Sequence, residues 1–282
     1  MEQAPTLLTS TSNGLIKQIV QWQEKPRARK KDGLFVVEGL REINLALKAD
    51  YQGSMFFYCN EIAQNNSAQS DSFKAWDFIK SLEKQGVKTY EVSLSVYKKI
   101  AYRNSTEGLI GVFKSKDHRL NGLKLKSKNP LILVAEAPEK PGNIGALLRT
   151  ADAAGVDAFL LANPLTDLYN PNIIRSSVGG LFTTTIATGT TQEIIDYLKG
   201  HNIAIYSAIL QQAIPYTEAD YSKSAAIVVG TEAEGLSETW RSASHAKVKI
   251  PMNGAIDSMN VSVSAGILIY EALRQRSINA FK

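Results

Sequence analysis

Cysteine is almost absent from this chain, and its scarcity excludes several kinds of protein. Cys59 is the only cysteine among 282 residues, so no internal disulfide can form and no multi-thiolate metal site is possible. The three histidines, His118, His201 and His245, lie far apart in the sequence and fit no metal-ligand spacing. We therefore expect no metal centre, and we expect a protein of the reducing cytoplasm.

Long apolar runs are also missing. No window approaches the ~18 uninterrupted apolar residues that a membrane-spanning helix needs. The first ten residues, MEQAPTLLTS, resemble neither a secretory signal nor an arginine-rich transit peptide. The sequence thus predicts a protein without membrane attachment. Its apolar fraction of 44% is sufficient for ordinary packed cores.

Charge is unevenly distributed along the chain. Residues 1–129 contain 21 lysines and arginines against 13 acidic residues, a net charge of +8. Residues 130–282 contain 11 against 14, a net charge of −3. Such asymmetry between halves is typical of a protein whose basic part contacts a polyanion, although a solvated basic surface gives the same count. The length of 282 residues fits two domains or one large one.

The first part of the chain alternates segments typical of helices and strands. Leu15–Trp22 has helical apolar spacing, and the stretch Lys25–Lys31 then contains five basic residues in seven. Residues 1–113 therefore form a small α/β domain in this interpretation. We expect its further helices at 38–48 and 72–85, and its strands at 34–37, 55–59, 87–92 and 108–113.

A polar stretch, residues 114–129, separates this domain from a second α/β unit. It carries six lysines and arginines and little apolar content, which predicts a basic linker. The apolar run Leu131–Val134 that follows is typical of a central parallel strand. Strands alternating with helices predict a mostly parallel sheet with helices on both faces over residues 130–282. We expect its other strands at 158–161, 203–207, 226–229 and 248–250, and helices at 142–154 and 260–276.

The first of three motif segments is PGNIGALLRTAD, residues 141–152. Gly142, Gly145 and Arg149 lie on one side of the helix that it predicts, and this bare face would admit a ligand or another helix. A surface arginine beside ordinary packing glycines is the alternative. The opposite, core-facing stripe consists of Ile144, Leu147, Leu148, Ala151 and Gly155.

The other two motif segments follow strands, at the sheet edge where open α/β sheets bind ligands. In IVVGTEAEGL, residues 227–236, Gly230 and Gly235 frame an acidic turn without the Gly-Lys-Ser/Thr of a P-loop. In IPMNGAIDSMNVS, residues 250–262, a polar loop leads into a long helix that we expect Asp257 or Ser258 to cap. Each segment alone is also explained as an ordinary connection.

Together and in this order, GNIGALLRTADAAG, GTEAEGL and IPMNGAIDSMNVSVSAGILIYEAL resemble the three motifs of the SpoU (TrmH-like) RNA ribose methyltransferases of the SPOUT superfamily. The stretch NIIRSSVGGLF, residues 172–182, resembles that family's segment between the first two motifs. This likeness covers about residues 130–276. FVVEG, residues 35–39, together with the basic run, resembles the small ribosomal-protein-like RNA-binding domain that many members carry.

The resemblance implies a fold, a cofactor and a partner. The fold would be a mostly parallel α/β sheet whose C-terminal segment threads a loop, forming a deep trefoil knot. The chain would form a homodimer through the C-terminal domain, which agrees with a closing helix that is apolar on two sides. The methyl donor would be S-adenosyl-L-methionine. The residues implied to bind it are Gly230, Gly235, Ile250, Met252, Met259 and Asn260.

The resemblance also implies catalytic residues: Asn143, Arg149, Glu232, Ser258 and Asn260. The family's arginine is assigned to activation of the ribose 2′-hydroxyl, but a guanidinium is a poor proton acceptor. For Arg149 the easier role is to clamp the adjacent phosphate and stabilise developing alkoxide charge. The neutral side chains would position the acceptor, and Glu232 would hold the arginine or the donor.

The sequence therefore predicts an S-adenosylmethionine-dependent enzyme that methylates a ribose 2′-hydroxyl, of ribosomal RNA rather than transfer RNA. Two alternatives stay open: a transfer-RNA ribose methyltransferase, and a non-catalytic RNA-binding assembly factor on the same scaffold. RNA contacts are expected from Lys25, Arg27, Arg29, Lys30, Lys31 and Arg175.

Overall fold

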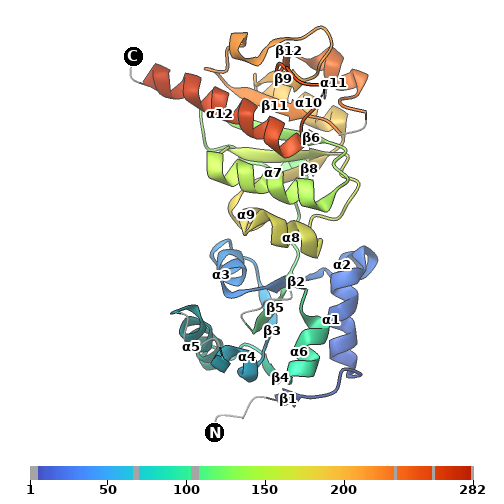
Figure 1. The fold of residues 1–282 in the computed structure, drawn as a ribbon, viewed down its shortest axis with the longest axis vertical. Helices are drawn as coiled ribbons and strands as arrows, with labels where there is room; N and C mark the ends of the chain where they lie inside the picture. The colour runs from blue at the N-terminus through green and yellow to red at the C-terminus, as the bar shows by residue number, and fades with distance from the viewer. Residues whose placement is uncertain (1–5, 66–69, 103–107, 232–233, 256–257, 281–282) are drawn as a thin grey trace. The chain divides into compact units, whose positions relative to one another are not determined.

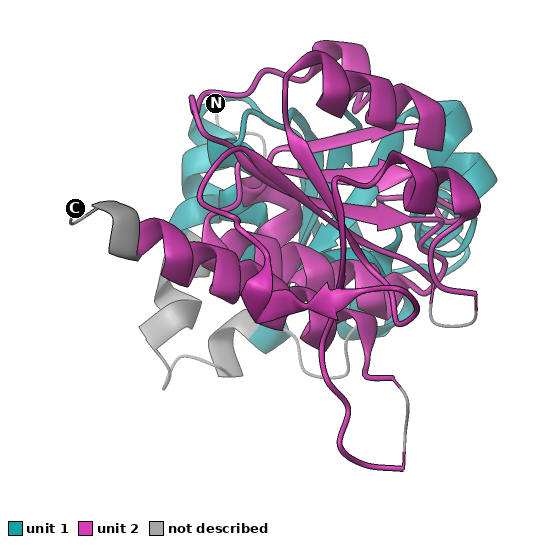
Figure 2. Cartoon of the chain, turned by 90° about the horizontal axis from the view of Figure 1, so that it is seen from above, with its two compact units in different colours: residues 1–116, 169–174 teal, residues 117–168, 175–282 magenta. Residues whose placement is uncertain are grey.

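The computed structural model describes residues 6–65, 70–102, 108–231, 234–255 and 258–280, and it divides into two compact units (Figure 1 and Figure 2). Unit 1 comprises residues 1–116 and 169–174, and unit 2 comprises residues 117–168 and 175–282. The chain therefore passes between the units three times, whereas a single linker would cross once.

Unit 1 is built on a five-stranded mixed sheet in the order β1-β4-β3-β5-β2. β2 and β3 run antiparallel to β5, whereas β1 and β3 run parallel to β4. The four expected strands are present within two residues of their expected ends, and β1 is an addition. The bounds are β1 (Thr6–Leu8), β2 (Leu34–Glu38), β3 (Gly53–Tyr58), β4 (Thr89–Val92) and β5 (Leu109–Lys114).

The helices of unit 1 cover this sheet. They are α1 (Gly14–Glu24), α2 (Pro26–Asp32), α3 (Leu40–Lys48), α4 (Asn60–Asn65), α5 (Ser70–Lys84) and α6 (Leu94–Ile100). α1 and α6 share a core with one face of the sheet, to which α1 contributes Ile16, Ile19 and Trp22. Cys59 lies in the same core, and burial raises the pKa of its thiol, as suits a packing residue.

Residues 169–174 belong to unit 1 because Tyr169 completes an aromatic cluster there. Its ring stacks on Phe35 with centroids 4.1 Å apart. Its hydroxyl donates to the Tyr51 hydroxyl at 3.4 Å and accepts from the Lys116 N–H at 2.9 Å. A buried tyrosine with both its ring and its hydroxyl engaged is a strong local anchor.

Unit 2 is built on a seven-stranded sheet in the order β10-β12-β9-β11-β6-β7-β8, and every pairing is parallel. The central strands β6, β7 and β11 are buried along their whole length, as continuous apolar runs predict. The bounds are β6 (Leu131–Glu136), β7 (Ala158–Ala162), β8 (Ile186–Gly189), β9 (Ala204–Ala208), β10 (Ile214–Pro215), β11 (Ala225–Val229) and β12 (Ala246–Lys249).

Helices lie on both faces of this sheet, so the prediction of a mostly parallel, doubly covered sheet is confirmed (Figure 1). α10 and α11 bury Ile194, Leu198 and Trp240 on one face. α7 and α12 pack against each other and against the strands of the other face. The bounds are α7 (Pro141–Ala154), α9 (Gly180–Thr183), α10 (Thr191–Gly200), α11 (Glu238–Ala243) and α12 (Val261–Ala280), with 3-10 turns at Leu120–Gly122 and Tyr216–Glu218. A further helix, α8 (Pro171–Ser177), spans the boundary: its residues 171–174 belong to unit 1 and its residues 175–177 to unit 2.

Residues 117–129, which we expected to form most of a basic linker, pack on unit 2. Leu120, Leu123 and Leu125 lie half-buried against the core beneath α10. The carbonyl of His118 accepts the N–H of Thr188 at 2.6 Å, which joins this stretch to β8. Within the described part of the chain, no helix is both long enough and apolar enough to cross a bilayer.

Candidate functional site

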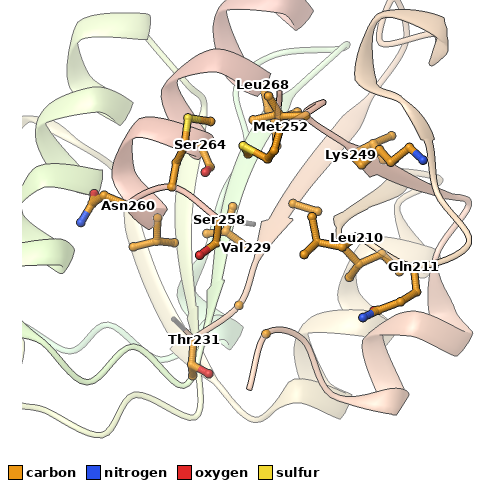
Figure 3. A pocket seen from close by; sticks show the side chains of 18 of the residues that line it. Leu210, Gln211, Val229, Thr231, Lys249, Met252, Ser258, Asn260, Ser264 and Leu268 are labelled. Carbon is orange, nitrogen blue, oxygen red and sulfur yellow. The ribbon is translucent and has the colours of Figure 1, made fainter. Parts of the chain in front are cut away.

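The carboxyl ends of β9, β11 and β12 surround a cavity of about 560 Å³, which we call the main cavity (Figure 3). Three stretches form most of its lining: residues 208–211 at the end of β9, residues within 229–235 at the end of β11, and residues within 248–264 from the end of β12 into the start of α12; Arg241 and Leu268 complete it. The last two stretches contain the second and third motif segments, which folding thus brings together. Parallel sheets bind ligands at this edge, and the volume is typical of small-molecule sites.

The second motif segment forms a turn that is closed at its base. The N–H of Thr231 donates to the carbonyl of Gly235 at 3.1 Å, and the N–H of Gly235 donates to the carbonyl of Thr231 at 3.0 Å. A Cβ added to Gly230 would lie 2.2 Å from the carbonyl carbon and oxygen of Gly235. Gly235 itself has φ +69°, which favours glycine. Backbone atoms therefore form this part of the cavity wall.

The third motif segment supplies the facing wall. Ser258 and Asn260 lie on one side of the main cavity, and Leu210 and Gln211 lie on the opposite side (Figure 3). All six residues that the sequence predicts to bind the donor line the cavity: Gly230, Gly235, Ile250, Met252, Met259 and Asn260. The wall is thus a mixture of backbone, polarizable thioethers and neutral polar side chains, with Glu234, Arg241 and Lys249 as its charged members.

Asn260 performs two tasks. Its Oδ1 accepts from the N–H of Ser262 at 3.0 Å and from the Ser262 hydroxyl at 2.6 Å, so it caps α12. Our expectation that Ser258 caps this helix is wrong, because the helix begins three residues later. Asp257 lies outside the described residues. The Nδ2 of Asn260 donates to Oδ1 of Asn143 at 3.2 Å, which joins the third motif segment to the first.

Asn143 lies at the start of α7 and lines a second, smaller cavity of about 110 Å³. Lys140 and Glu139 line it as well, and it shares Gly230 and other wall residues with the main cavity. The hydrogen bond between Asn143 and Asn260 therefore joins a residue of each cavity wall.

Arg149 is exposed on α7 and lines neither cavity. It lies six residues beyond Asn143, which is about 9 Å along a helix axis. The glycine face of α7 that was predicted to admit a ligand or another helix packs against α8 at Gly145. A Cβ added there would lie 1.9 Å from Oγ of Ser176. Gly155 is not part of the buried stripe: it is exposed and ends α7 with φ +63°. Glu232 lies outside the described residues.

Most of the basic run Lys25–Lys31 lies in the helix α2, and Lys25 is the residue immediately before its first turn. Lys25, Arg27, Lys30 and Lys31 are exposed and form what we call the α2 basic set. Arg29 is only 4% exposed, and its Nη1 donates to the carbonyls of Trp22 at 2.6 Å and Gln23 at 2.8 Å. The prediction that Arg29 contacts RNA is therefore wrong, because its guanidinium is buried against α1. Arg175 is exposed on α8.

Sequence reasoning missed residues 208–211, Arg241 and Lys249, all of which line the main cavity. The strand at 203–207 was expected, and the carboxyl ends of parallel strands form the ligand-binding edge. The residues that follow this strand, 208–211, could therefore have been predicted to line the site. Arg241 belongs to α11, a helix that the sequence did not predict. Among the described residues, no three His, Cys, Asp or Glu side chains gather as metal ligands would.

Comparison with known proteins decides which family this geometry represents. The sequence profile of the SpoU rRNA Methylase family matches residues 130–270, half of the chain, and includes all three motif segments. The chain belongs to the SpoU rRNA methylase family. The profile of an MRM3-like substrate binding domain matches residues 13–111, within unit 1. The family resemblance stated from the motifs is confirmed.

Solved and curated relatives of this SpoU protein agree. A solved RNA 2′-O ribose methyltransferase is 36% identical, with a TM-score of 0.79, and the match covers 96% of this chain and 100% of that one. The AdoMet-bound rRNA methyltransferase from Sinorhizobium meliloti is 25% identical, with a TM-score of 0.81 over 95% of this chain and 97% of that one. The 23S rRNA (guanosine(2553)-2'-O)-methyltransferase RlmP of Bacillus subtilis (strain 168) is 34% identical over 49% of this chain and 56% of its own length.

Proposed function

We propose that this SpoU family member transfers a methyl group from S-adenosyl-L-methionine to the 2′-hydroxyl of a ribose in RNA, with ribosomal RNA favoured over transfer RNA. The observation that carries the proposal is the main cavity, built from the second and third motif segments and joined to the first by the hydrogen bond from Asn260 to Asn143. The activities of the relatives and the match to the MRM3-like substrate binding domain support the choice of RNA.

The main cavity fits the donor. Its volume suits a nucleoside with an amino-acid tail, and at Gly230 the wall is backbone packed so closely on Gly235 that no side chain fits there. Met252, Met259 and Leu210 offer apolar surface for an adenine ring. Backbone groups near Gly230 and Ile250 would hydrogen-bond its edges. When bound, the donor supplies an electrophilic methyl group on a positively charged sulfur.

The acceptor side requires side chains. Transfer needs the hydroxyl oxygen, the methyl carbon and the sulfur in line, so positioning carries much of the rate. Asn143, Ser258 and Asn260 would orient the ribose through neutral hydrogen bonds. Arg149 would clamp the neighbouring phosphate and stabilise the developing alkoxide, since a guanidinium stays protonated at any physiological pH. Glu232 would hold that arginine or the donor.

A homodimer formed through the C-terminal domain belongs to the same proposal. α12 exposes Val263 (51%) and Tyr270 (52%), with half-buried Ile267 between them on the same helix face. Such an apolar stripe on an exposed helix face is typical of a subunit interface. Light scattering tests it: the wild type should have twice the monomer mass, and Val263→Asp combined with Tyr270→Asp should give monomers. A monomeric wild type would remove the dimer from the proposal.

Three finer features are proposed with it. One is the trefoil knot that the family resemblance implies, and the packing of the C-terminal helix α12 on α7 and β11, elements from earlier in the chain, is consistent with it. The α2 basic set and Arg175 are proposed to contact RNA phosphates. A cytoplasmic location is supported by the single, buried cysteine.

The deciding experiment is methyl transfer from labelled S-adenosylmethionine to total RNA from cells that lack this protein, followed by separation of ribosomal and transfer RNA. We expect alkali-resistant ribose label in the ribosomal fraction. Label in the transfer fraction would favour the transfer-RNA alternative. Absence of label from naked RNA and from ribosome-assembly intermediates, with RNA binding intact, would favour the non-catalytic assembly factor and overturn the proposal.

A further inference from the structure

One peptide group beside the main cavity is held from both ends by charged side chains. The carbonyl of Leu236 accepts from Nε of Arg241 at 2.9 Å. The N–H of Ser237, which belongs to the same peptide, donates to Oε2 of Glu136 at 2.8 Å. Because a peptide group is planar, fixing its carbonyl and its N–H fixes its orientation. This peptide lies one peptide group beyond Gly235, where the second-motif turn closes.

Glu136 is a buried carboxylate whose hydrogen bonds come from several elements. It ends β6 and is only 7% exposed. Its Oε1 accepts from the Ser237 hydroxyl at 2.6 Å and from the Thr191 hydroxyl, at the start of α10, at 3.1 Å. Nδ2 of Asn163 in turn donates to the Thr191 oxygen at 3.0 Å. A buried charge is costly unless it is fully hydrogen-bonded, and these donors meet that requirement.

Arg241 connects two walls of the main cavity, which it lines itself. Besides the Leu236 carbonyl after β11, its guanidinium reaches the side chain of Gln211 after β9, with Nη1 3.4 Å from Oε1. Gln211 lies on the side of the cavity opposite Ser258 (Figure 3). Arg241 thus couples the loop after β9 to the second-motif turn.

We propose that Glu136 and Arg241 are positioning residues for the methyl donor: together they fix the 236–237 peptide, and through it the Gly230–Gly235 wall of the main cavity. The inference rests on the proposed function, because it assigns these two residues to the donor site of that reaction. Neither residue needs to touch the donor for this role, since each acts through the backbone that does.

The first test is donor affinity, measured by calorimetry on the full chain with S-adenosylmethionine. Glu136→Ala should raise the donor Kd by about 10-fold, the effect of losing hydrogen bonds to a charged group. Glu136→Gln should stay within about 3-fold, because its amide oxygen can accept from the Ser237 N–H while its NH₂ faces hydroxyls that can turn to accept. RNA affinity and the urea midpoint of Glu136→Gln should match the wild type.

A double-mutant cycle tests whether both residues act on one peptide. Arg241→Ala should also raise the donor Kd by about 10-fold. In the double variant the donor Kd should rise by clearly less than the product of the two single-variant factors, because either substitution alone already frees the same peptide. Glu238→Gln is the matched control: its carboxylate is exposed on α11, bonded to Ser242 of the same helix, and should leave the Kd unchanged.

The outcomes separate this inference from the proposed function. If the wild type binds no S-adenosylmethionine, the proposed function fails. If the wild type binds it and Glu136→Ala binds equally well, only the positioning role fails. The shared-peptide explanation is overturned by either of two results. One is that Glu136→Gln loses as much donor affinity as Glu136→Ala; the other is that the Kd increases of Glu136→Ala and Arg241→Ala multiply in the double variant.

Discussion

Replacing Gly230 with alanine should weaken methyl-donor binding, because the wall of the main cavity has no room for a Cβ. That atom would lie 2.2 Å from the carbonyl carbon and oxygen of Gly235 and 2.6 Å from the nitrogen of Leu236. Ordinary Cβ contacts begin at 3.4 Å, so the second-motif turn would have to retreat by more than 1 Å. All three obstructing atoms are backbone, and no change of rotamer can relieve the overlap.

Overpacking of this kind costs about 1–3 kcal/mol. If the turn moves away in the free protein and must be returned for binding, the whole cost appears in the donor Kd, which would rise about 5- to 140-fold at 1.4 kcal/mol per factor of ten. If the turn cannot move, the same cost lowers the free energy of unfolding. Calorimetry with S-adenosylmethionine and urea unfolding of the same preparation measure both.

Gly266→Ala in α12 is the matched control. Its new Cβ would meet Cγ2 of Thr150 at 3.7 Å, an ordinary contact. Because glycine in a helix interior is about 0.5–1 kcal/mol less favourable than alanine, this variant should be as stable as the wild type or more so. If Gly230→Ala bound the donor with wild-type affinity and unfolded at the wild-type urea concentration, the backbone-wall explanation of the cavity would be refuted.

Three further predictions concern the acceptor side and unit 1. Arg149→Ala should abolish methyl transfer while leaving the donor Kd within a few-fold, because this exposed side chain lines neither cavity; activity assays and calorimetry check both. Neutralising the α2 basic set should weaken RNA binding and reduce its salt slope by roughly 0.7–0.9 per lost phosphate contact in titrations at several salt concentrations. Tyr169→Ala should lower the unfolding free energy of unit 1 by about 3 kcal/mol, since it removes the ring stacked on Phe35, whereas a surface control such as Asp196→Ala should not.

Much of the fold was predictable because strong hydrophobic patterns specify its centre. β6, β7 and β11 are apolar runs buried on both faces, and they were expected close to their observed bounds. The edge strands β8 and β10 were missed, because short strands with few apolar residues carry little periodicity. Leu120 and its neighbours were read as linker for the same reason: three spaced leucines among lysines make a weak signal.

The error at Arg29 has a different cause. The stretch Lys25–Lys31 was treated as one charged patch, although Pro26 at its start and Gly33 after its end are ordinary helix signals. In a helix, successive side chains of such a run point to different sides. Here the helical period directs Arg29 toward two carbonyls of α1, whereas the other basic side chains face solvent. Composition alone cannot distinguish an exposed cation from a buried one.

The two sides of the proposed reaction depend on different parts of the chain. The donor wall at Gly230 and Gly235 is backbone held in place by Glu136 and Arg241, so its requirements are geometric and hold for any acceptor. Base identity has no role in the transfer of a methyl group to a ribose hydroxyl. Selection among RNAs must therefore come from contacts outside the main cavity, and the exposed cations of α2 are suited to recognise the arrangement of phosphates on a folded RNA rather than its bases. It follows that exchanging unit 1 between family members should change which RNA is methylated, whereas substitutions at the donor wall should change the rate of methyl transfer to that RNA.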